Sequence, residues 1–580
     1  MSSLKRSFRY LKPYSKEATG AVILLALVVA ANLSIPRLVQ VIIDEGVAAQ
    51  DLDIIIRTSL LMIVASILSA LFMTGNTILA IKASRGVEAD FRDAIFTKIQ
   101  TYSFGNLDDF TTGQLLTRLT SDLNQVRLII TMSIRMFTRM PLTFILSIAL
   151  MWITNRQLSI IMAVLLPITL TLVYFFIRVS QPLFRKVQER VDYLNQVLQE
   201  NLTGIRVVKA FVRREHENNR FEKTNDELYA ASVKINRNLG IFMPFITLLL
   251  NLGTVAVIYF GGIQVFRGTS SVGEIIAFIN YLSSAMFSVI VLSSMAGQIS
   301  AAEASAKRIF QVIDEEPKIK GKPEAVKPDS IDGRIVFEDV SFSYGADGGL
   351  PVLFDVNFVV EPGETVAILG ATGSGKSTLV HLIPRFYDVN EGRITIDGWD
   401  VRDLELETLR KAVGISLQDT ILFSGTIRDN IRYGRSDATE EEVISVAKAA
   451  QAHDFIMSFR DGYDSIVGQR GVNLSGGQKQ RLAIARVLLI KPKILILDDS
   501  TSSVDVETEI KIEEALETIM KGSTSIIIAQ RISTVLKADK ILVLDKGSIA
   551  DIGSHRELLE SSPIYREIYD SQLGEGVQFE

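Results

Sequence analysis

The chain has 580 residues, of which 48% are hydrophobic and 22% charged, with a formal net charge of −5. This composition excludes a mostly disordered protein and disfavours a wholly soluble one. The sequence contains no cysteine and only four histidines, which excludes disulfide frameworks, cysteine-ligated metals and thiol catalysis and disfavours a histidine-rich metal centre.

The charge is unevenly divided along the chain. Residues 1–302 carry 29 Lys/Arg and 20 Asp/Glu, a net charge of +9. Residues 303–580 carry the remaining 32 Lys/Arg and 46 Asp/Glu, a net charge of −14. The average therefore combines two regions of different character.

The first region holds six uncharged, apolar stretches near the length of about 20 residues that a membrane-spanning helix needs. They are residues 18–36, 58–81, 140–155, 157–177, 238–266 and 275–302. The third is short by itself, and extending it back to Met132 brings in Arg135 and Arg139. A buried helix of a soluble protein would explain one such stretch but not six, so we expect a membrane domain.

Basic residues set the expected orientation of these spans. Most lie before the first span and in the loops at 82–131 and 178–237, whereas the short connections carry one each, Arg57, Arg156 and Arg267. The positive-inside rule then places both termini in the cytoplasm, with Arg135 and Arg139 at the cytoplasmic end of the third span. The two long loops are expected to extend the spans as helices whose tips dock on a cytoplasmic domain, although solvated helices are the simpler alternative.

The second region begins after a helical tail at 303–315 and a proline-containing linker at 316–333. From residue 334 onward, strand-like and helical runs alternate, which is typical of an α/β domain. The predicted fold is an all-α transmembrane domain of six helices at 1–315, the linker at 316–333, and an α/β nucleotide-binding domain at 334–580.

A phosphate-binding loop follows the apolar strand predicted at 365–369. The segment GATGSGKST satisfies the pattern G-x-x-x-x-G-K-[ST] and leads into a helical run. The glycines let backbone N–H groups approach phosphate oxygens, the lysine reaches the β- and γ-phosphates, and the serine hydroxyl can ligate Mg²⁺. The candidate residues are Gly370, Thr372, Gly373, Ser374, Gly375, Lys376, Ser377 and Thr378.

Two further motifs complete a nucleotide site. Asp498 ends the apolar run at 494–497, where a carboxylate suits a hard cation that bridges phosphates. Between the two motifs, LSGGQ precedes a helix predicted at 479–489 and offers a second anion-binding surface. Its residues are Leu474, Ser475, Gly476, Gly477 and Gln478.

LSGGQ between a P-loop and an apolar-Asp strand, after six spans, resembles the ATP-binding cassette (ABC) exporter family over essentially the whole chain. The resemblance implies that ATP and Mg²⁺ bind, with Tyr344 stacking on adenine and with Ser377, Gln418 and Asp498 holding the metal. It also implies that Asp505 in SSVD contacts the opposite site, and that segments near 104–112 and 204–214 relay cassette closure. In this family two cassettes pair head to tail around two ATP molecules, so a second half-transporter is required.

Two positions depart from the hydrolytic pattern of the family. Asp499 stands where a Glu usually orients the attacking water, and Gln530 stands where a His usually contacts the γ-phosphate. Asp is one methylene shorter than Glu, and Gln lacks the charge that an imidazole can carry. Gln469 also replaces an acid often found in the cross-domain segment.

Because LSGGQ is intact, the chain resembles the degenerate-site subunit of heterodimeric bacterial multidrug exporters, whose partner supplies Glu and His. A homodimer with two slow sites is the alternative. The expected function is ATP-driven export of hydrophobic or amphipathic compounds across the bacterial cytoplasmic membrane. Lipid or lipid-linked export is the alternative substrate class, and a regulatory subunit that binds ATP without a transport path is a competing class. An importer and a soluble DNA-acting ATPase are disfavoured. Expected partners are membrane lipids and the transported small molecules, with no nucleic acid.

Overall fold

The computed structural model describes residues 2–345, 350–529 and 531–573. The chain divides into two compact units. The helical unit comprises Met1–Gln100 and Thr112–Glu315, and the α/β unit comprises Thr101–Thr111 and Glu316–Glu580. The short segment Thr101–Thr111, although it follows the second long helix, therefore belongs to the α/β unit.

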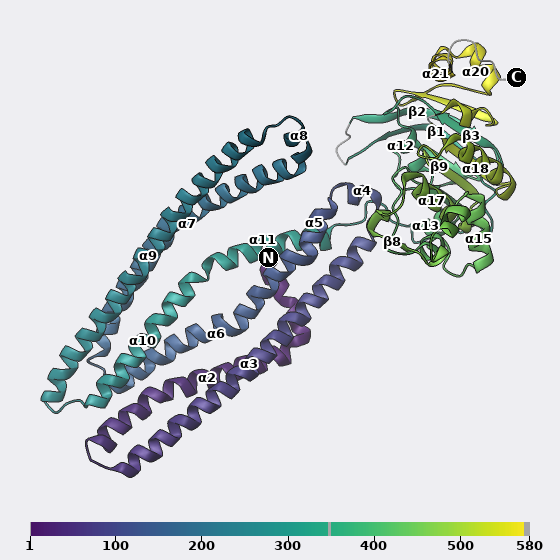
Figure 1. The fold of residues 1–580 in the computed structure, drawn as a ribbon. Coiled ribbons are helices and arrows are strands. Elements are labelled where there is room, and N and C mark those ends of the chain that lie inside the picture. Colours follow the sequence, from purple (N-terminus) through teal and green to yellow (C-terminus); the bar gives the residue numbers. More distant parts are fainter. Residues whose placement is uncertain (1, 346–349, 530, 574–580) are drawn as a thin grey trace. The chain divides into compact units, whose positions relative to one another are not determined.

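The helical unit is built almost entirely from helices, several of them very long (Figure 1). They are α1 (Ser3–Ser7), α2 (Ser15–Val41), α3 (Leu52–Gln100), α5 (Thr112–Thr117), α6 (Leu123–Thr154), α7 (Ser159–Thr203), α8 (Ile205–Ala210), α9 (Arg214–Phe266), α10 (Val272–Ser294) and α11 (Ala296–Asp314).

Within the described residues, six helical segments are long and apolar enough to cross a membrane. The longest, α9, has 53 residues, which corresponds to about 80 Å of helix at 1.5 Å per residue. A hydrocarbon core is about 30 Å thick, so more than half of this helix lies outside it. The predicted helical extension of the spans is thereby confirmed.

The long helices associate in pairs because each presents apolar side chains to a neighbour. α2 packs along α3, α6 along α10, and α7 along α9 (Figure 1). A buried cluster joins α2, α6, α7, α9 and α10, with Leu33, Met151, Leu158, Val257 and Phe278 among its members.

The α/β unit contains short strands and helices. The strands are β1 (Ile335–Ser343), β2 (Pro351–Val360), β3 (Thr365–Leu369), β4 (Glu391–Ile396), β5 (Trp399–Asp400), β6 (Val413–Ser416), β7 (Gly425–Thr426), β8 (Ile466–Val467), β9 (Ile494–Asp498), β10 (Thr524–Ile528), β11 (Lys540–Asp545) and β12 (Ser548–Gly553). The helices are α4 (Phe104–Asp108), α12 (Lys376–Leu382), α13 (Leu406–Ala412), α14 (Ile427–Arg432), α15 (Glu440–Ala449), α16 (His453–Ser458), α17 (Gly476–Ile490), α18 (Val506–Ile519), α19 (Ile532–Val535), α20 (His555–Ser561) and α21 (Pro563–Leu573).

Two sheets position the site. The larger has the strand order β12-β11-β3-β10-β9-β6 and is parallel except for β12. The smaller is antiparallel, in the order β2-β1-β4-β5. Parallel strands align their carboxyl ends along one edge, which is where α/β folds bind ligands.

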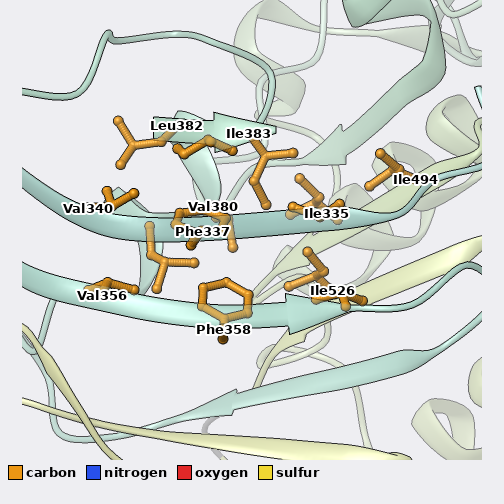
Figure 2. Close-up of a cluster of buried hydrophobic side chains, with 14 of the residues drawn as sticks. Ile335, Phe337, Val340, Val356, Phe358, Val380, Leu382, Ile383, Ile494 and Ile526 are labelled. Atoms are coloured by element: carbon orange, nitrogen blue, oxygen red, sulfur yellow. The ribbon is translucent and has the colours of Figure 1, made fainter. Parts of the chain in front are cut away.

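A buried apolar cluster joins the two sheets to α12. Figure 2 shows Phe337 and Phe358, which pair across β1 and β2, beside Val380 of α12, Ile494 of β9 and Ile526 of β10. The rings of Phe337 and Phe358 stack with their centroids 4.4 Å apart. This cluster fixes the helix that follows the P-loop against both sheets.

Candidate nucleotide site and its docking segment

The P-loop connects β3 to α12 at the carboxyl edge of the larger sheet, with β11 and β10 on either side of β3. Gly375 has φ +103°, and a Cβ there would lie 2.8 Å from Leu353 Cδ2. A Cβ on Gly370 would lie 2.2 Å from the carbonyl oxygen of Leu544. Both glycines are therefore needed to bring the loop backbone close to its neighbours.

Lys376 folds back over this loop. Its Nζ donates hydrogen bonds to the carbonyl oxygens of Gly370 at 2.8 Å and Ala371 at 2.9 Å. Burial lowers the pKa of the Lys376 ammonium, and the nearby Asp498 and Asp499 oppose this shift. The ammonium thus lies at the loop that would cradle phosphates. Of the other loop residues, Thr372 and Gly373 are exposed, whereas Ser374 is buried.

Ser377 and Asp498 meet across the P-loop and β9. The Ser377 hydroxyl donates to Asp498 Oδ1 at 3.0 Å, and Asp498 is only 2% exposed. Burial raises the pKa of Asp498, while the bond from Ser377 and the charge of Lys376 lower it. A hydroxyl and a carboxylate are the hard oxygen ligands that Mg²⁺ prefers, so this pair fits a metal bound with ATP.

The third predicted metal ligand, Gln418, lies two residues beyond β6 and is exposed. The last residue of β6, Ser416, pairs with Leu497, which precedes Asp498. Among the described residues, no three His, Cys, Asp or Glu side chains gather into a metal-binding group. A metal here would need the nucleotide's own phosphates in addition to the oxygens of Ser377, Asp498 and Gln418.

Asp499 begins the turn after β9. It is 8% exposed and has φ +48°, and its N–H donates to the Ile528 carbonyl at 3.3 Å. Burial and the adjacent Asp498 raise the pKa of Asp499. The other position that departs from the family pattern, Gln530, lies outside the described residues. Its neighbour Arg531 pairs with the buried Glu509 at 2.8 Å.

The LSGGQ segment starts α17 with a capping box. The N–H of Gln478 donates to Ser475 Oγ at 3.3 Å, and the N–H of Ser475 donates to Gln478 Oε1 at 2.9 Å. Leu474 is buried in the apolar cluster of the surrounding helices, and Gly476 and Gly477 form the first turn. A Cβ on Gly477 would lie 2.8 Å from the Ser503 carbonyl oxygen. The motif therefore packs closely on the loop after β9.

The remaining predicted residues are anchored locally. The Tyr344 hydroxyl shares a 2.9 Å hydrogen bond with Thr378 Oγ1, and its ring packs edge-on against Tyr387. This places an aromatic ring, 39% exposed, beside the start of α12. Asp505 caps α18 by accepting from the Thr508 N–H at 3.0 Å, which lowers the pKa of its carboxyl.

The segment Thr101–Thr111, called the docking segment below, packs on the rest of the α/β unit through aromatic side chains. The Phe104 ring of α4 stacks on Phe386 with centroids 4.1 Å apart. The Tyr387 hydroxyl donates to Asp108 Oδ2 at 2.9 Å. Since Tyr387 also contacts Tyr344, one side chain touches both the segment and the nucleotide-side tyrosine. The expectation that the tip of the first long loop docks on the cassette is confirmed.

Asn106 holds this segment in place from a fully buried position. Its Nδ2 donates to the Glu316 carbonyl at 2.9 Å, and its Oδ1 accepts from the Lys318 N–H at 2.8 Å. The same oxygen accepts from the N–H and hydroxyl of Ser103 at 3.2 and 2.7 Å. The Lys318 ammonium pairs with Asp109 at 2.6 Å. One amide thus ties the tip to the first residues of the linker.

Several site residues were not singled out from the sequence. Gln480 donates to the Ser502 hydroxyl and accepts from the Ser503 N–H, which ties α17 to the loop after Asp499. Glu509 bridges Thr501 to Arg531. Burial lowers the pKa of His381, whose Nε2 lies 3.7 Å from Asp498. Gln480 follows LSGGQ by two residues, so its proximity to the motif could have indicated a role in the site. No local sequence pattern indicates Glu509 or His381.

The fold and site define a class: a nucleotide-binding P-loop unit joined in one chain to a helical unit able to span a membrane. The family model for the ABC transporter transmembrane region matches residues 19–289, and the ABC transporter model matches residues 353–502. The chain belongs to the ABC transporter family, and it is an exporter-type half-transporter that hydrolyses ATP. Transporters of this exporter fold work as dimers.

Curated relatives span the whole chain. An uncharacterized ABC transporter ATP-binding protein, YfiB of Bacillus subtilis, is 40% identical over 98% of this chain and 99% of its own length. An ATP-dependent lipid A-core flippase of Syntrophus aciditrophicus is 35% identical over 99% and 95%, respectively. The putative multidrug export protein YgaD of Bacillus subtilis is 38% identical over 99% and 100%.

A solved structure has the same fold. The ATP-bound structure of a bacterial Atm1-family ABC exporter superimposes with a TM-score of 0.81 at 27% identity, covering 97% of this chain and 99% of that one. This match spans both units and confirms the predicted fold class, six membrane-type helices followed by an α/β nucleotide-binding domain.

Proposed function

We propose that the chain is one half of a heterodimeric exporter of hydrophobic or amphipathic compounds in the bacterial cytoplasmic membrane. Its own P-loop side forms a hydrolysis-poor ATP site. Its LSGGQ segment completes the competent site of a partner that supplies Glu and His. Both termini and the nucleotide-binding domain, residues 334–580, face the cytoplasm.

The observation that carries this proposal is the environment of Asp499. A general base must reach the attacking water at roughly 2.6–3.2 Å or act through one further water. The carboxylate is one methylene too short for the position that Glu occupies, and it is buried beside Asp498. Burial and a like charge both favour the protonated form, which accepts a proton poorly.

The binding side of the same site is intact. Lys376 and the P-loop backbone would hold the phosphates, Tyr344 the adenine, and Ser377, Asp498 and Gln418 a Mg²⁺ ion. Bound Mg²⁺ would neutralise negative charge on the phosphates. ATP would therefore bind and hold the dimer closed without rapid hydrolysis on this side.

The docking segment supports a path from the cassette to the helices. The contacts of Phe104 and Asn106 hold the segment that follows α3, so movement of the α/β unit would move this helix end. The second relay segment, 204–214, contains α8 and, directly after it, Phe211 and Val212, whose side chains are 73% and 84% exposed. We assign it the same role toward the partner's cassette.

The names of the relatives leave two substrate classes, drugs and lipids. YgaD is named a multidrug export protein and the Syntrophus protein a lipid A-core flippase. A homodimer with two slow sites is the competing assembly.

ATPase measurements on the purified chain test the proposal. Alone, it should hydrolyse ATP slowly, and Asp499→Glu combined with Gln530→His should raise the rate at least about tenfold. The matched control Glu517→Asp changes an exposed acid by the same methylene and should leave the rate unchanged. Rapid ATP hydrolysis by the unmodified chain alone would refute the degenerate-site assignment.

A further inference from the structure

Two cavities in the helical unit share the same arginine. The first, of about 220 Å³, is lined by residues of α2, α3 and α6, among them Asn76, Arg135 and Arg139. The second, of about 190 Å³, is lined by residues of α2, α6 and α10, among them Asn32, Arg139 and Phe287. Arg139 and Met140 border both cavities, so α6 presents one guanidinium to two adjoining spaces.

Arg139 lies at membrane depth. It precedes Thr154, the last residue of α6, by 15 positions, or about 22 Å along the helix, within a hydrocarbon thickness of about 30 Å. Its cavity neighbours Val29 and Phe287 belong to the middle of the apolar stretches of α2 and α10. An arginine at this depth is costly unless a partner or ligand compensates its charge.

Within the described residues, Arg139 has no hydrogen-bond or ion-pair partner. α6 contains no Asp or Glu at all. Of the acids on the helices packed against α6, Glu17 pairs with Lys82, Glu88 with three arginines, and Glu274 with the start of its own helix. Arg135, one turn earlier, donates to the Thr77 hydroxyl at 3.1 Å and adds a second positive charge.

A second observation comes from Asn76, which is fully buried and lines the first cavity. Its Nδ2 donates to the Ala21 carbonyl at 2.8 Å, but its Oδ1 has no hydrogen-bond partner. An unsatisfied buried amide oxygen is costly, and a ligand hydroxyl or protonated acid would satisfy it. Met73, Met132, Met136 and Met140 form the adaptable apolar wall of the same cavity.

We propose that these cavities bind an acidic amphiphile, with its anionic head on Arg139 and Arg135, its hydroxyl on Asn76 and its apolar tail along the methionine wall. This inference rests on the proposed export function and names its substrate class. The charge favours anions over the cationic amphiphiles that multidrug exporters are expected to accept, and the apolar walls favour a tailed anion over a free one.

The test is binding without ATP, by the assembled transporter in phosphatidylcholine nanodiscs. The probes are dodecyl phosphate, dodecyltrimethylammonium and dodecyl maltoside, which share one tail, with empty nanodiscs subtracted. Dodecyl phosphate should bind at least about tenfold more tightly than the other two, because a charged hydrogen-bonding pair in an apolar site is worth at least that factor. Inorganic phosphate at millimolar concentration should not displace it.

The variants separate this site from general membrane association. Arg139→Gln should lower the affinity for dodecyl phosphate at least about tenfold and leave that for dodecyl maltoside unchanged, whereas Arg139→Lys should keep most of it. Arg156→Gln, which removes a cation from the loop after α6, is the matched control. Equal binding of the three amphiphiles, unchanged affinity in Arg139→Gln, or displacement by inorganic phosphate overturns the inference.

A separate measurement keeps the two proposals apart. Transport of dodecyl phosphate into inverted vesicles requires ATP, whereas the binding assay does not. Binding that depends on Arg139 without ATP-driven uptake would refute export and leave the site standing. ATP-driven uptake of other compounds without such binding would refute the acidic-amphiphile site alone.

Discussion

Asn106→Ala should release the docking segment from the α/β unit. The substitution removes four hydrogen bonds made by one fully buried side chain, three to its oxygen and one from its nitrogen. At a net value near 1 kcal/mol each, less what water recovers, the attachment should weaken by about 2–4 kcal/mol. This corresponds to local opening that is about 30- to 700-fold more frequent.

Hydrogen exchange in the assembled transporter measures this opening directly. Backbone amides of 101–111 should exchange faster by that factor, while amides of β3 and β9 keep their protection. ATP hydrolysis should persist, whereas ATP-driven uptake should fall, because the α3 end no longer follows the cassette. Asn219→Ala, an exposed amide on α9, is the control. Exchange within about threefold of the unmodified protein would refute the reasoning.

Three further predictions concern the α/β unit. Gly375→Ala should lower ATP affinity at least about tenfold in an equilibrium titration, because the left-handed backbone and Leu353 leave no room for a Cβ; unchanged affinity would contradict this. Burial and the neighbouring Glu509 raise the pKa of Glu513 to about 7. Between about pH 4.3 and 7 the folded state therefore keeps a proton that the unfolded chain releases. The free energy of unfolding that this proton contributes is lost as pH rises toward 7. Glu513→Gln should therefore stabilise the protein by about 1–2 kcal/mol at pH 8, after discounting for solvent screening, and by much less at pH 5. A melting-temperature shift of equal size at pH 5 and pH 8 would contradict this assignment of the Glu513 pKa. Glu509→Gln removes the ion pair to Arg531 on the hydrolysis-poor side, so ATP hydrolysis by the assembled transporter should stay within about twofold while the melting temperature falls; a tenfold loss of hydrolysis would contradict this.

The parts of the fold that were predictable carry strong local patterns. The strand at 365–369 coincides with β3, and Asp498 ends β9, because a run of buried apolar residues followed by a glycine-rich or acidic turn specifies a parallel strand. The membrane-type helices follow from the absence of charge over about 20 residues.

The rest depends on contacts distant in sequence. The smaller sheet was not predicted strand by strand, since β1 and β2 have bulges that break the two-residue alternation. Nothing near Phe386 indicates that its ring would stack on Phe104, 282 positions earlier. Sequence alone predicted Arg139 at a membrane edge, and only the packing of α2 and α10 on α6 shows the cavities that it borders.

The central claim is that the chain brings a weak P-loop side and a sound LSGGQ segment to a shared pair of sites. The most direct test compares two variants in the transporter assembled with its partner, with ATP hydrolysis as the readout. Asp499→Asn should leave the rate within about twofold, whereas Ser475→Glu, which places a negative charge at the phosphate-facing helix start, should lower it at least about tenfold. A large loss with Asp499→Asn and little loss with Ser475→Glu would contradict the account.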